Sequence, residues 1–230
     1  MHPLDNPIWN ALNSDDKNKN QGNDQVSIFF PEISPFVGLE NWNTISQQML
    51  FEQLPVTRSC STLIAQPFVV EDYFELIFSL TLYQLVCNSI KPFNGKPAQI
   101  VRLVEKDIPA MLELTTLTKP GPFSERTIDF GNYVGIFDNQ KLVAMAGERL
   151  HLPNYSEVSA VCTHPDYVGR GYAALLVYHL TQQILKSGKS AFLHVRQDNE
   201  RAIQLYQGIG FEIRTDMYFA VMKPKANFRG

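Results

Sequence analysis

VCTHPDYVGRGYAA, residues 161–174, leads from an apolar strand through a short loop into the first turn of a helix. Gly169 and Gly171 lack a Cβ, so the backbone of this loop can approach a ligand closely. The N–H groups of the first helical turn have no partner inside the helix, and the positive end of the helix dipole lies behind them. Arg170 adds a full positive charge at the same place. The stretch therefore predicts an anion-binding site whose simplest occupant is a phosphate-rich ligand.

The glycine spacing also fits the Gly-x-Gly-x-x-Ala fingerprint of dinucleotide-binding domains, with Ala174 in the last position. Two observations argue against an NAD site. The loop before Gly169 holds several residues, including Pro165, where the fingerprint needs a tight turn. In addition, only 56 residues follow Ala174, which is too few for the remaining strands of such a domain.

Two motifs in this half of the chain resemble those of the acyl-CoA N-acyltransferase (GNAT) superfamily. Residues 168–173 are similar to motif A, Arg/Gln-x-x-Gly-x-Gly/Ala, except that Val168 replaces the usual Arg or Gln. Residues 199–211 are similar to motif B, in which Asn, Ala, Leu-Tyr and Gly-Phe recur at fixed spacing. The motifs follow each other in the family's order, and the resemblance covers about residues 97–224.

The resemblance implies a GNAT fold of class α/β, with a mixed sheet flanked by helices in αβα layers. It implies that the fourth and fifth strands of the sheet splay apart, and that the pantetheine arm of acetyl-CoA, or another acyl-CoA, lies between them. No metal is implied. The donor-binding residues implied by the match are Val161, Cys162, Thr163, Val168, Gly169, Arg170, Gly171, Tyr172, Ala173, Ala174, Asn199 and Ala202.

The resemblance also implies direct attack of an amine on the thioester. An amine of pKa near 10.4 is neutral at pH 7 only about once in 2,500 molecules, so deprotonation costs roughly 4.6 kcal/mol. A carboxylate base is the usual answer, and it contributes about 10²–10⁴ in rate. Glu157, at the start of a strand and eleven residues before Val168, is the first candidate base; a strand-edge carboxylate in water or an ion pair is the competing interpretation. Glu148, inside an apolar strand, is the second, with structural pairing as its competing interpretation.

Tyr206 lies seven residues after Asn199, on the same face of a short helix. By resemblance, this tyrosine protonates the departing thiolate; core packing is the alternative. Cys162 and His164 share a strand face, but two ligands without a third make no zinc site, and a thiol nucleophile needs a base from elsewhere in the fold. The histidines expected to be structural are His151, His179 and His194.

Composition excludes several classes of partner. The net charge is −3 and no two Lys or Arg residues are adjacent, so neither a nucleic-acid footprint nor a polybasic membrane contact is predicted. Three cysteines without CxxC spacing favour free thiols in a reducing compartment, and the first residues lack the pattern of a signal peptide, so we expect a cytoplasmic protein. Exposed strand edges are compatible with a homodimer.

The segment Lys91–Pro97, with two prolines and a glycine, predicts a boundary between an N-terminal α/β segment, residues 1–95, and the GNAT domain, residues 97–230. About ninety residues bury too little surface to be stable alone. We therefore expect this smaller half-domain to pack on the GNAT domain, extending its sheet or shaping its acceptor pocket. Glu71–Asn88 is predicted to be a helix buried against the sheet, since polar residues interrupt it and it is shorter than a membrane span.

The other predicted elements alternate along the chain. Strands are expected at 26–30, 58–66, 100–103, 133–137, 141–150, 158–162 and 191–195, helices at 44–52, 108–118, 171–187 and 199–207, and a closing hairpin at 211–215 with 218–222.

The sequence thus predicts an enzyme that transfers an acyl group, most simply acetyl, from acyl-CoA to an amine of a small molecule, amino acid or peptide. A non-catalytic acyl-CoA-binding or scaffold protein is the alternative, suggested by Val168 and by the open choice of base. The presence of both Glu157 and Tyr206 favours catalysis.

Overall fold

The computed structural model describes residues 2–228, which form one eight-stranded mixed sheet and a small second sheet. The strand order of the large sheet is β3-β10-β4-β9-β8-β7-β6-β5. Its strands are β3 (Cys60–Ile64), β4 (Phe74–Cys87), β5 (Val101–Arg102), β6 (Val134–Asp138), β7 (Lys141–Leu152), β8 (Tyr155–Thr163), β9 (Ser190–Arg196) and β10 (Glu212–Pro224). The second sheet pairs β1 (Val26–Ile28) with β2 (Val37–Leu39).

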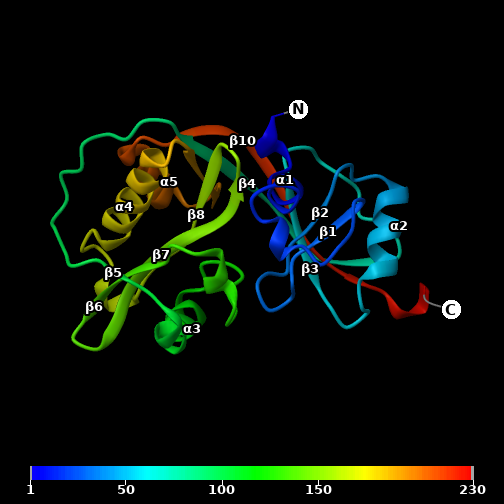
Figure 1. Cartoon of the computed structure of the whole chain (residues 1–230), viewed down its shortest axis with the longest axis horizontal. Coiled ribbons are helices and arrows are strands. Elements are labelled where there is room, and N and C mark those ends of the chain that lie inside the picture. The colour runs from blue at the N-terminus through cyan, green and yellow to red at the C-terminus, as the bar shows by residue number, and fades with distance from the viewer. Residues whose placement is uncertain (1, 229–230) are drawn as a thin grey trace.

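Helices cover the large sheet, as the GNAT resemblance implies (Figure 1). α4 (Tyr172–Lys186) places Leu176, Leu180 and Ile184 in the core, which confirms the apolar face expected from their spacing. α4 also connects β8 to β9, and these two strands are parallel, as predicted for a helical crossover. The remaining helices are α1 (Pro7–Leu12), α2 (Thr44–Gln53), α3 (Ile108–Thr118) and α5 (Glu200–Ile209).

The predicted helix at Glu71–Asn88 is wrong, because Phe74–Cys87 is the long strand β4. Apolar residues lie on both sides of this segment, so its pattern did not separate a buried helix from a buried strand. Its aromatic and β-branched residues suit a strand, but long-range pairing decides the outcome. β4 lies between β10 and β9 and is antiparallel to both.

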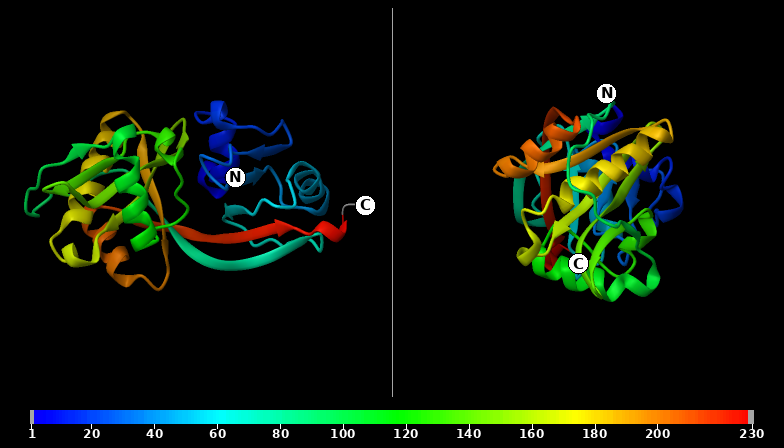
Figure 2. Two further views of the ribbon diagram at one scale, coloured as in Figure 1. Left: turned by 90° about the horizontal axis from the view of Figure 1, so that it is seen from below. Right: turned by 90° about the vertical axis from the view of Figure 1, so that its left-hand side faces the viewer.

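The predicted C-terminal hairpin is also wrong. Residues 212–224 form the single strand β10, which pairs with β4 along its whole length and with β3 beyond Met217. Residues 216 and 217, where the predicted hairpin would turn, stay paired with Tyr83 and Leu82 of β4, and the register shift lies earlier, between Ile213 and Thr215. Together β4 and β10 form a long curved ribbon, called the β4–β10 ribbon below, which runs from the α4 end of the molecule to the α2 end (Figure 2).

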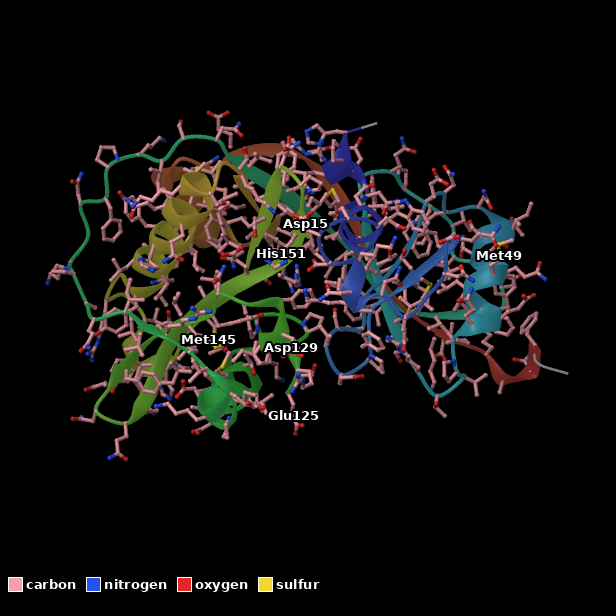
Figure 3. The ribbon with its side chains drawn as sticks, in the orientation of Figure 1. Asp15, Met49, Glu125, Asp129, Met145 and His151 are labelled. Carbon is pink, nitrogen blue, oxygen red and sulfur yellow. The ribbon has the colours of Figure 1, made fainter. Side chains whose placement is uncertain are left out.

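The N-terminal residues pack on the large sheet through β7 and the ribbon. Asp16 accepts a hydrogen bond from the backbone N–H of His151 at 2.8 Å and lies 3.1 Å from its Nδ1. The neighbouring Asp15 pairs with Lys189 at 2.6 Å. Figure 3 labels Asp15 and His151 at this junction. Two strands from the residues before 95 belong to the large sheet: β3 lies at its edge and β4 lies between β10 and β9.

No helix among residues 2–228 combines the length and the apolar character needed to cross a membrane.

Candidate active site

The parallel strands β8 and β9 pair only at their N-terminal ends, where Tyr155–Glu157 face Ser190–Phe192. Beyond Glu157 the pairing stops, although both strands continue, so the sheet opens between them as the family resemblance implies. Ala160 has a φ of 51°, and the β7–β8 register shifts between Met145 and Gly147, next to this residue. The bulge bends β8 where the opening begins.

One cavity, of about 400 Å³, lies between this opening and the glycine-containing loop; we call it the glycine-loop cavity. It is lined by Val161, Cys162, Thr163, Tyr167, Val168, Gly169, Gly171, Tyr172, Ala173, Ala174, Asn199, Arg201, Ala202, Leu205 and Tyr206. The structure thus brings together all of the predicted donor-binding residues except Arg170, which stacks over the Tyr167 ring at 4.5 Å.

The backbone of the loop explains its glycines. Gly169 and Gly171 have φ values of +89° and +84°, a region that disfavours residues with a Cβ. Gly171 is the N-cap of α4 and provides no side-chain cap, so the N–H groups of the first turn stay available. A Cβ at either glycine would meet no protein atom within 4 Å, which means that both positions face open space. This geometry suits a phosphate-bearing ligand.

A second cavity, of about 900 Å³, lies on the other side of the opening. We call it the ribbon cavity, because the β4–β10 ribbon forms one of its walls through Phe78 and Phe219. Phe36 and Leu63 come from the N-terminal residues, and the 118–122 loop completes the lining. The residues shared with the glycine-loop cavity are Val161, Cys162, Thr163, Asn199 and Tyr206. The two cavities therefore meet where β8 and β9 separate.

Tyr206, on α5, lies at this meeting point and lines both cavities. Its hydroxyl makes no hydrogen bond within residues 2–228, and burial raises its pKa to about 12. Asn199 caps α5 by accepting a hydrogen bond from the Ala202 N–H at 3.2 Å. The capping interpretation of Asn199 is therefore correct, and the same residue lines both cavities.

Glu157 is fully buried and already has two partners. Arg149 donates to its two carboxylate oxygens at 2.7 and 2.6 Å, and the His194 ring nitrogen Nδ1 lies 2.7 Å from Oε1. Burial alone would raise the pKa of Glu157, but the Arg149 and His194 contacts lower it to about 2. Such a carboxylate is a weak base at neutral pH. Arg149 and His194 line the ribbon cavity, whereas Glu157 lies behind them.

The orientation of the His194 ring follows from its other neighbour, Gln84. Arg214 can only donate, so its Nε fixes the Gln84 carbonyl oxygen as the acceptor, which leaves the Gln84 amide to donate. That amide donates to the Leu4 carbonyl at 2.9 Å and lies 2.9 Å from His194 Nε2. His194 Nε2 therefore carries the lone pair, and Nδ1 carries the proton that is donated to Glu157. Burial lowers the pKa of His194 below its usual 6.5, so the ring is neutral at pH 7.

Glu148 faces neither cavity. Its carboxylate accepts hydrogen bonds from Asn132 at 2.8 Å and from the Ser156 hydroxyl, and it lies 3.3 Å from His151 Nε2. Burial would raise the pKa of Glu148, but these three partners together lower it. Structural pairing, the competing interpretation of Glu148, therefore describes its surroundings.

Several residues that line the two cavities were not predicted from the sequence. Tyr167 and Arg201 line the glycine-loop cavity, and their nearness to the two motifs was the available signal. Arg149 and His194 had no such signal, since their proximity depends on three strands meeting around Glu157. The sequence predicts a structural role for His194, and the structure shows that its side chain also lines the ribbon cavity. Within residues 2–228, no cluster of three His, Cys, Asp or Glu side chains could hold a metal ion.

Comparisons with known proteins agree with this geometry. Residues 133–220 match the model of the FR47-like protein family. The ribosomal protein bS18-alanine N-acetyltransferase of Salmonella typhimurium is 31% identical over 115 residues, which is 47% of this chain and 77% of that enzyme. The mycothiol acetyltransferase of Mycolicibacterium vanbaalenii is 32% identical over 91 residues; the match spans 36% of this chain and only 30% of that protein.

A solved structure matches nearly the whole chain. It is a protein from Novosphingobium aromaticivorans assigned to the GNAT acetyltransferases, with a TM-score of 0.90 and 30% identity, and the match covers 98% of this chain and 100% of that one. A similarity of this extent includes the residues before 95 as well as the two motifs. From the open strands, the glycine loop and these matches, we conclude that this chain belongs to the GNAT superfamily of N-acetyltransferases.

Proposed function

We propose that this protein transfers an acetyl group from acetyl-CoA to an amine of a small molecule, amino acid or peptide. The observation that carries the proposal is the meeting of two cavities at the separation of β8 and β9. A donor in the glycine-loop cavity and an acceptor in the ribbon cavity would bring thioester and amine together beside Tyr206. Holding two reactants in this way removes much of the entropic barrier to their reaction.

In this proposal, the first-turn N–H groups of α4 and the loop glycines bind the pyrophosphate of acetyl-CoA. The backbone of β8 from Val161 to Thr163, which has no partner strand on the β9 side, hydrogen-bonds to the pantetheine arm. The family's Arg or Gln side chain is absent at Val168, so backbone groups carry more of the anion binding than in other members. Arg201, in the wall of the same cavity, supplies a positive charge.

The attacking amine must lose a proton, and we assign its acceptance to His194. Of the described side chains that line the ribbon cavity, His194 is the one that is neutral and basic near pH 7. The others are cations, alcohols, apolar groups, the non-basic amide of Asn199, or the Cys162 thiol and Tyr206 hydroxyl, whose pKa values burial raises to about 11 and about 12. The Gln84 hydrogen bond to Nε2 must give way to one from the amine as the proton moves.

Glu157, the first candidate base, then acts through His194. It accepts the hydrogen bond from Nδ1, holds the ring in one tautomer, and stabilises the imidazolium that forms. Arg149 neutralises Glu157 between turnovers. For Glu148, the hydrogen bonds to Asn132, Ser156 and His151 support a structural role instead.

Tyr206 acts on the leaving sulfur. The C–S bond of the thioester breaks as the C–N bond forms, and the departing CoA thiolate takes up a proton to become the free thiol. With a pKa of about 12, the Tyr206 hydroxyl remains protonated at neutral pH and can donate a hydrogen bond to the departing sulfur. Its lack of a protein partner within residues 2–228 leaves it free for this purpose.

Replacing Tyr206 with Phe should lower kcat about 100-fold, because the hydroxyl acts only as the sulfur departs. The affinity for acetyl-CoA, measured by calorimetry, should change less than about threefold. Tyr178→Phe is the matched control and should change neither quantity, since Tyr178 lines neither cavity. Unchanged turnover in Tyr206→Phe would remove the acid role.

The proposed function is tested by titrating the protein with acetyl-CoA and, separately, NADH, and then by measuring thiol release with a panel of amines. We expect micromolar binding of acetyl-CoA and amine-dependent thiol release. Binding of acetyl-CoA without release for any amine would favour the non-catalytic acyl-CoA-binding alternative. Binding of NADH instead would show that the glycine loop serves a dinucleotide.

The state of the cysteines bears on where the protein is located. Cys60, Cys87 and Cys162 are buried free thiols, which supports a reducing compartment, and on that basis we propose the cytoplasm. The homodimer stays a prediction.

A further inference from the structure

The ribbon cavity has a mainly apolar wall. Phe78, Leu80 and Leu82 on β4 lie opposite Phe36, and Phe219 and Val221 on β10 continue the same surface. Phe78 is 47% exposed, which is high for a phenylalanine, and it lines this cavity. A wall of this kind binds a ligand through an apolar body.

The charges around the cavity are all positive. Among the described residues that line it, none is Asp or Glu, whereas Lys119, Arg149 and Arg196 each carry a positive charge. Arg196 is paired with Asp198 at 2.6 Å and Arg149 with Glu157. Lys119 has no ion pair within residues 2–228, so of the three cations it is the one whose charge no carboxylate compensates. A second ammonium group on the acceptor would meet repulsion here and no carboxylate.

Arg149 also has a hydrogen-bond donor that Glu157 does not use. Its Nε and Nη2 atoms bind Glu157, while Nη1 makes no hydrogen bond within residues 2–228 and is not among the enclosed polar atoms that lack a partner. Because Arg149 lines the cavity, Nη1 can donate to a ligand oxygen there. Lys119 and Arg149 Nη1 are therefore two anion donors beside an apolar wall.

Resting on the proposed acetyl transfer, we propose that the acceptor is an amine with an apolar body and a carboxylate, most simply an α-amino acid with a large apolar side chain. The ribbon holds the side chain, and Lys119 and Arg149 hold the carboxylate. The amine then faces His194 and the shared end of the cavity at Tyr206. Polyamines and lysine-rich peptides are excluded as good acceptors by the same charges.

The wild-type protein tests this with three acceptors in a thiol-release assay: L-phenylalanine, L-phenylalaninamide and spermidine. We expect kcat/KM to be highest for phenylalanine, about tenfold lower for the amide, which lacks the carboxylate, and lowest for spermidine. Equal values for phenylalanine and its amide, or a preference for spermidine, would overturn the proposal.

Two variants with matched controls separate the two halves of the site. Phe78→Ala should raise KM for phenylalanine about tenfold and leave KM for alanine unchanged, whereas Ile77→Ala, equally exposed at 48% but outside the cavity, should change neither. Lys119→Gln should raise KM for phenylalanine but not for its amide, and the exposed Lys141→Gln should leave both unchanged. An equal effect on both acceptors in Lys119→Gln would contradict carboxylate recognition.

Calorimetry with acetyl-CoA keeps this proposal separate from the one on which it rests. If acetyl-CoA binds and spermidine or another polycation is acetylated, the acceptor class is wrong and acetyl transfer stands. If acetyl-CoA does not bind, both proposals fail together.

Discussion

Gly171→Val should weaken acetyl-CoA binding at least 100-fold. The N-cap of α4 has a φ of +84°, which a β-branched residue adopts only at a cost of about 1–3 kcal/mol. A Cβ at this position meets no protein atom within 4 Å, so the new side chain would extend into the space in front of the first-turn N–H groups. That space is where the pyrophosphate is proposed to bind. Calorimetric titration with acetyl-CoA measures the loss directly.

Gly188→Val provides the control for backbone strain. Gly188 follows the other end of α4, has the same φ of +84°, and also has no protein atom within 4 Å of an added Cβ. We expect a similar fall in melting temperature for both variants, but normal acetyl-CoA binding only for Gly188→Val. Normal binding by Gly171→Val would refute the site, and equal loss in both would assign the effect to strain in α4.

His194→Gln should lower kcat about 100-fold at neutral pH, the second large effect. Glutamine can keep a donor toward Glu157 and an acceptor toward Gln84, so the buried hydrogen bonds persist while the proton-accepting nitrogen is lost. Affinity for acetyl-CoA should be unchanged. Steady-state kinetics with a saturating amine, together with the melting temperature, distinguish lost catalysis from lost folding.

The pH dependence gives a second measurement of the same role. Proton acceptance requires neutral His194, so the kcat of the wild type should fall as the pH drops through the pKa of this group. Burial places that pKa below 6.5, so the fall should occur on the acidic side of pH 6.5. This acidic fall in kcat should disappear in His194→Gln and remain in His179→Gln. The His179 ring lies outside both cavities and hydrogen-bonds to Gln183. If kcat of His194→Gln falls with pH as it does in the wild type, a group other than His194 accepts the proton.

The local sequence was sufficient to predict most of the residues that line the glycine-loop cavity. The segment from Val161 to Ala174 is continuous in the chain, and a strand, a glycine loop and a helix N-terminus follow one another there. The geometry of that unit depends on backbone conformations that glycine and an amphipathic helix impose locally. The same holds for Asn199 and Tyr206, which one short helix holds at a fixed spacing. Arg170 is the exception: it stacks on Tyr167, three residues earlier in the same loop, and does not line the glycine-loop cavity.

The sequence by itself therefore determined the fold family, the core strands around α4, and the segments that line the glycine-loop cavity. The tertiary structure decided the rest, because its contacts join residues far apart in the chain. Phe74–Cys87 became a strand through pairing with β9 and β10, more than a hundred residues away. Glu157 became a buried partner of Arg149 and His194, with a pKa of about 2, since three strands bring the Arg149 cation and the His194 hydrogen-bond donor to it in a low-dielectric interior. The local hydrophobic pattern predicts neither outcome. Both determine which residues line the ribbon cavity.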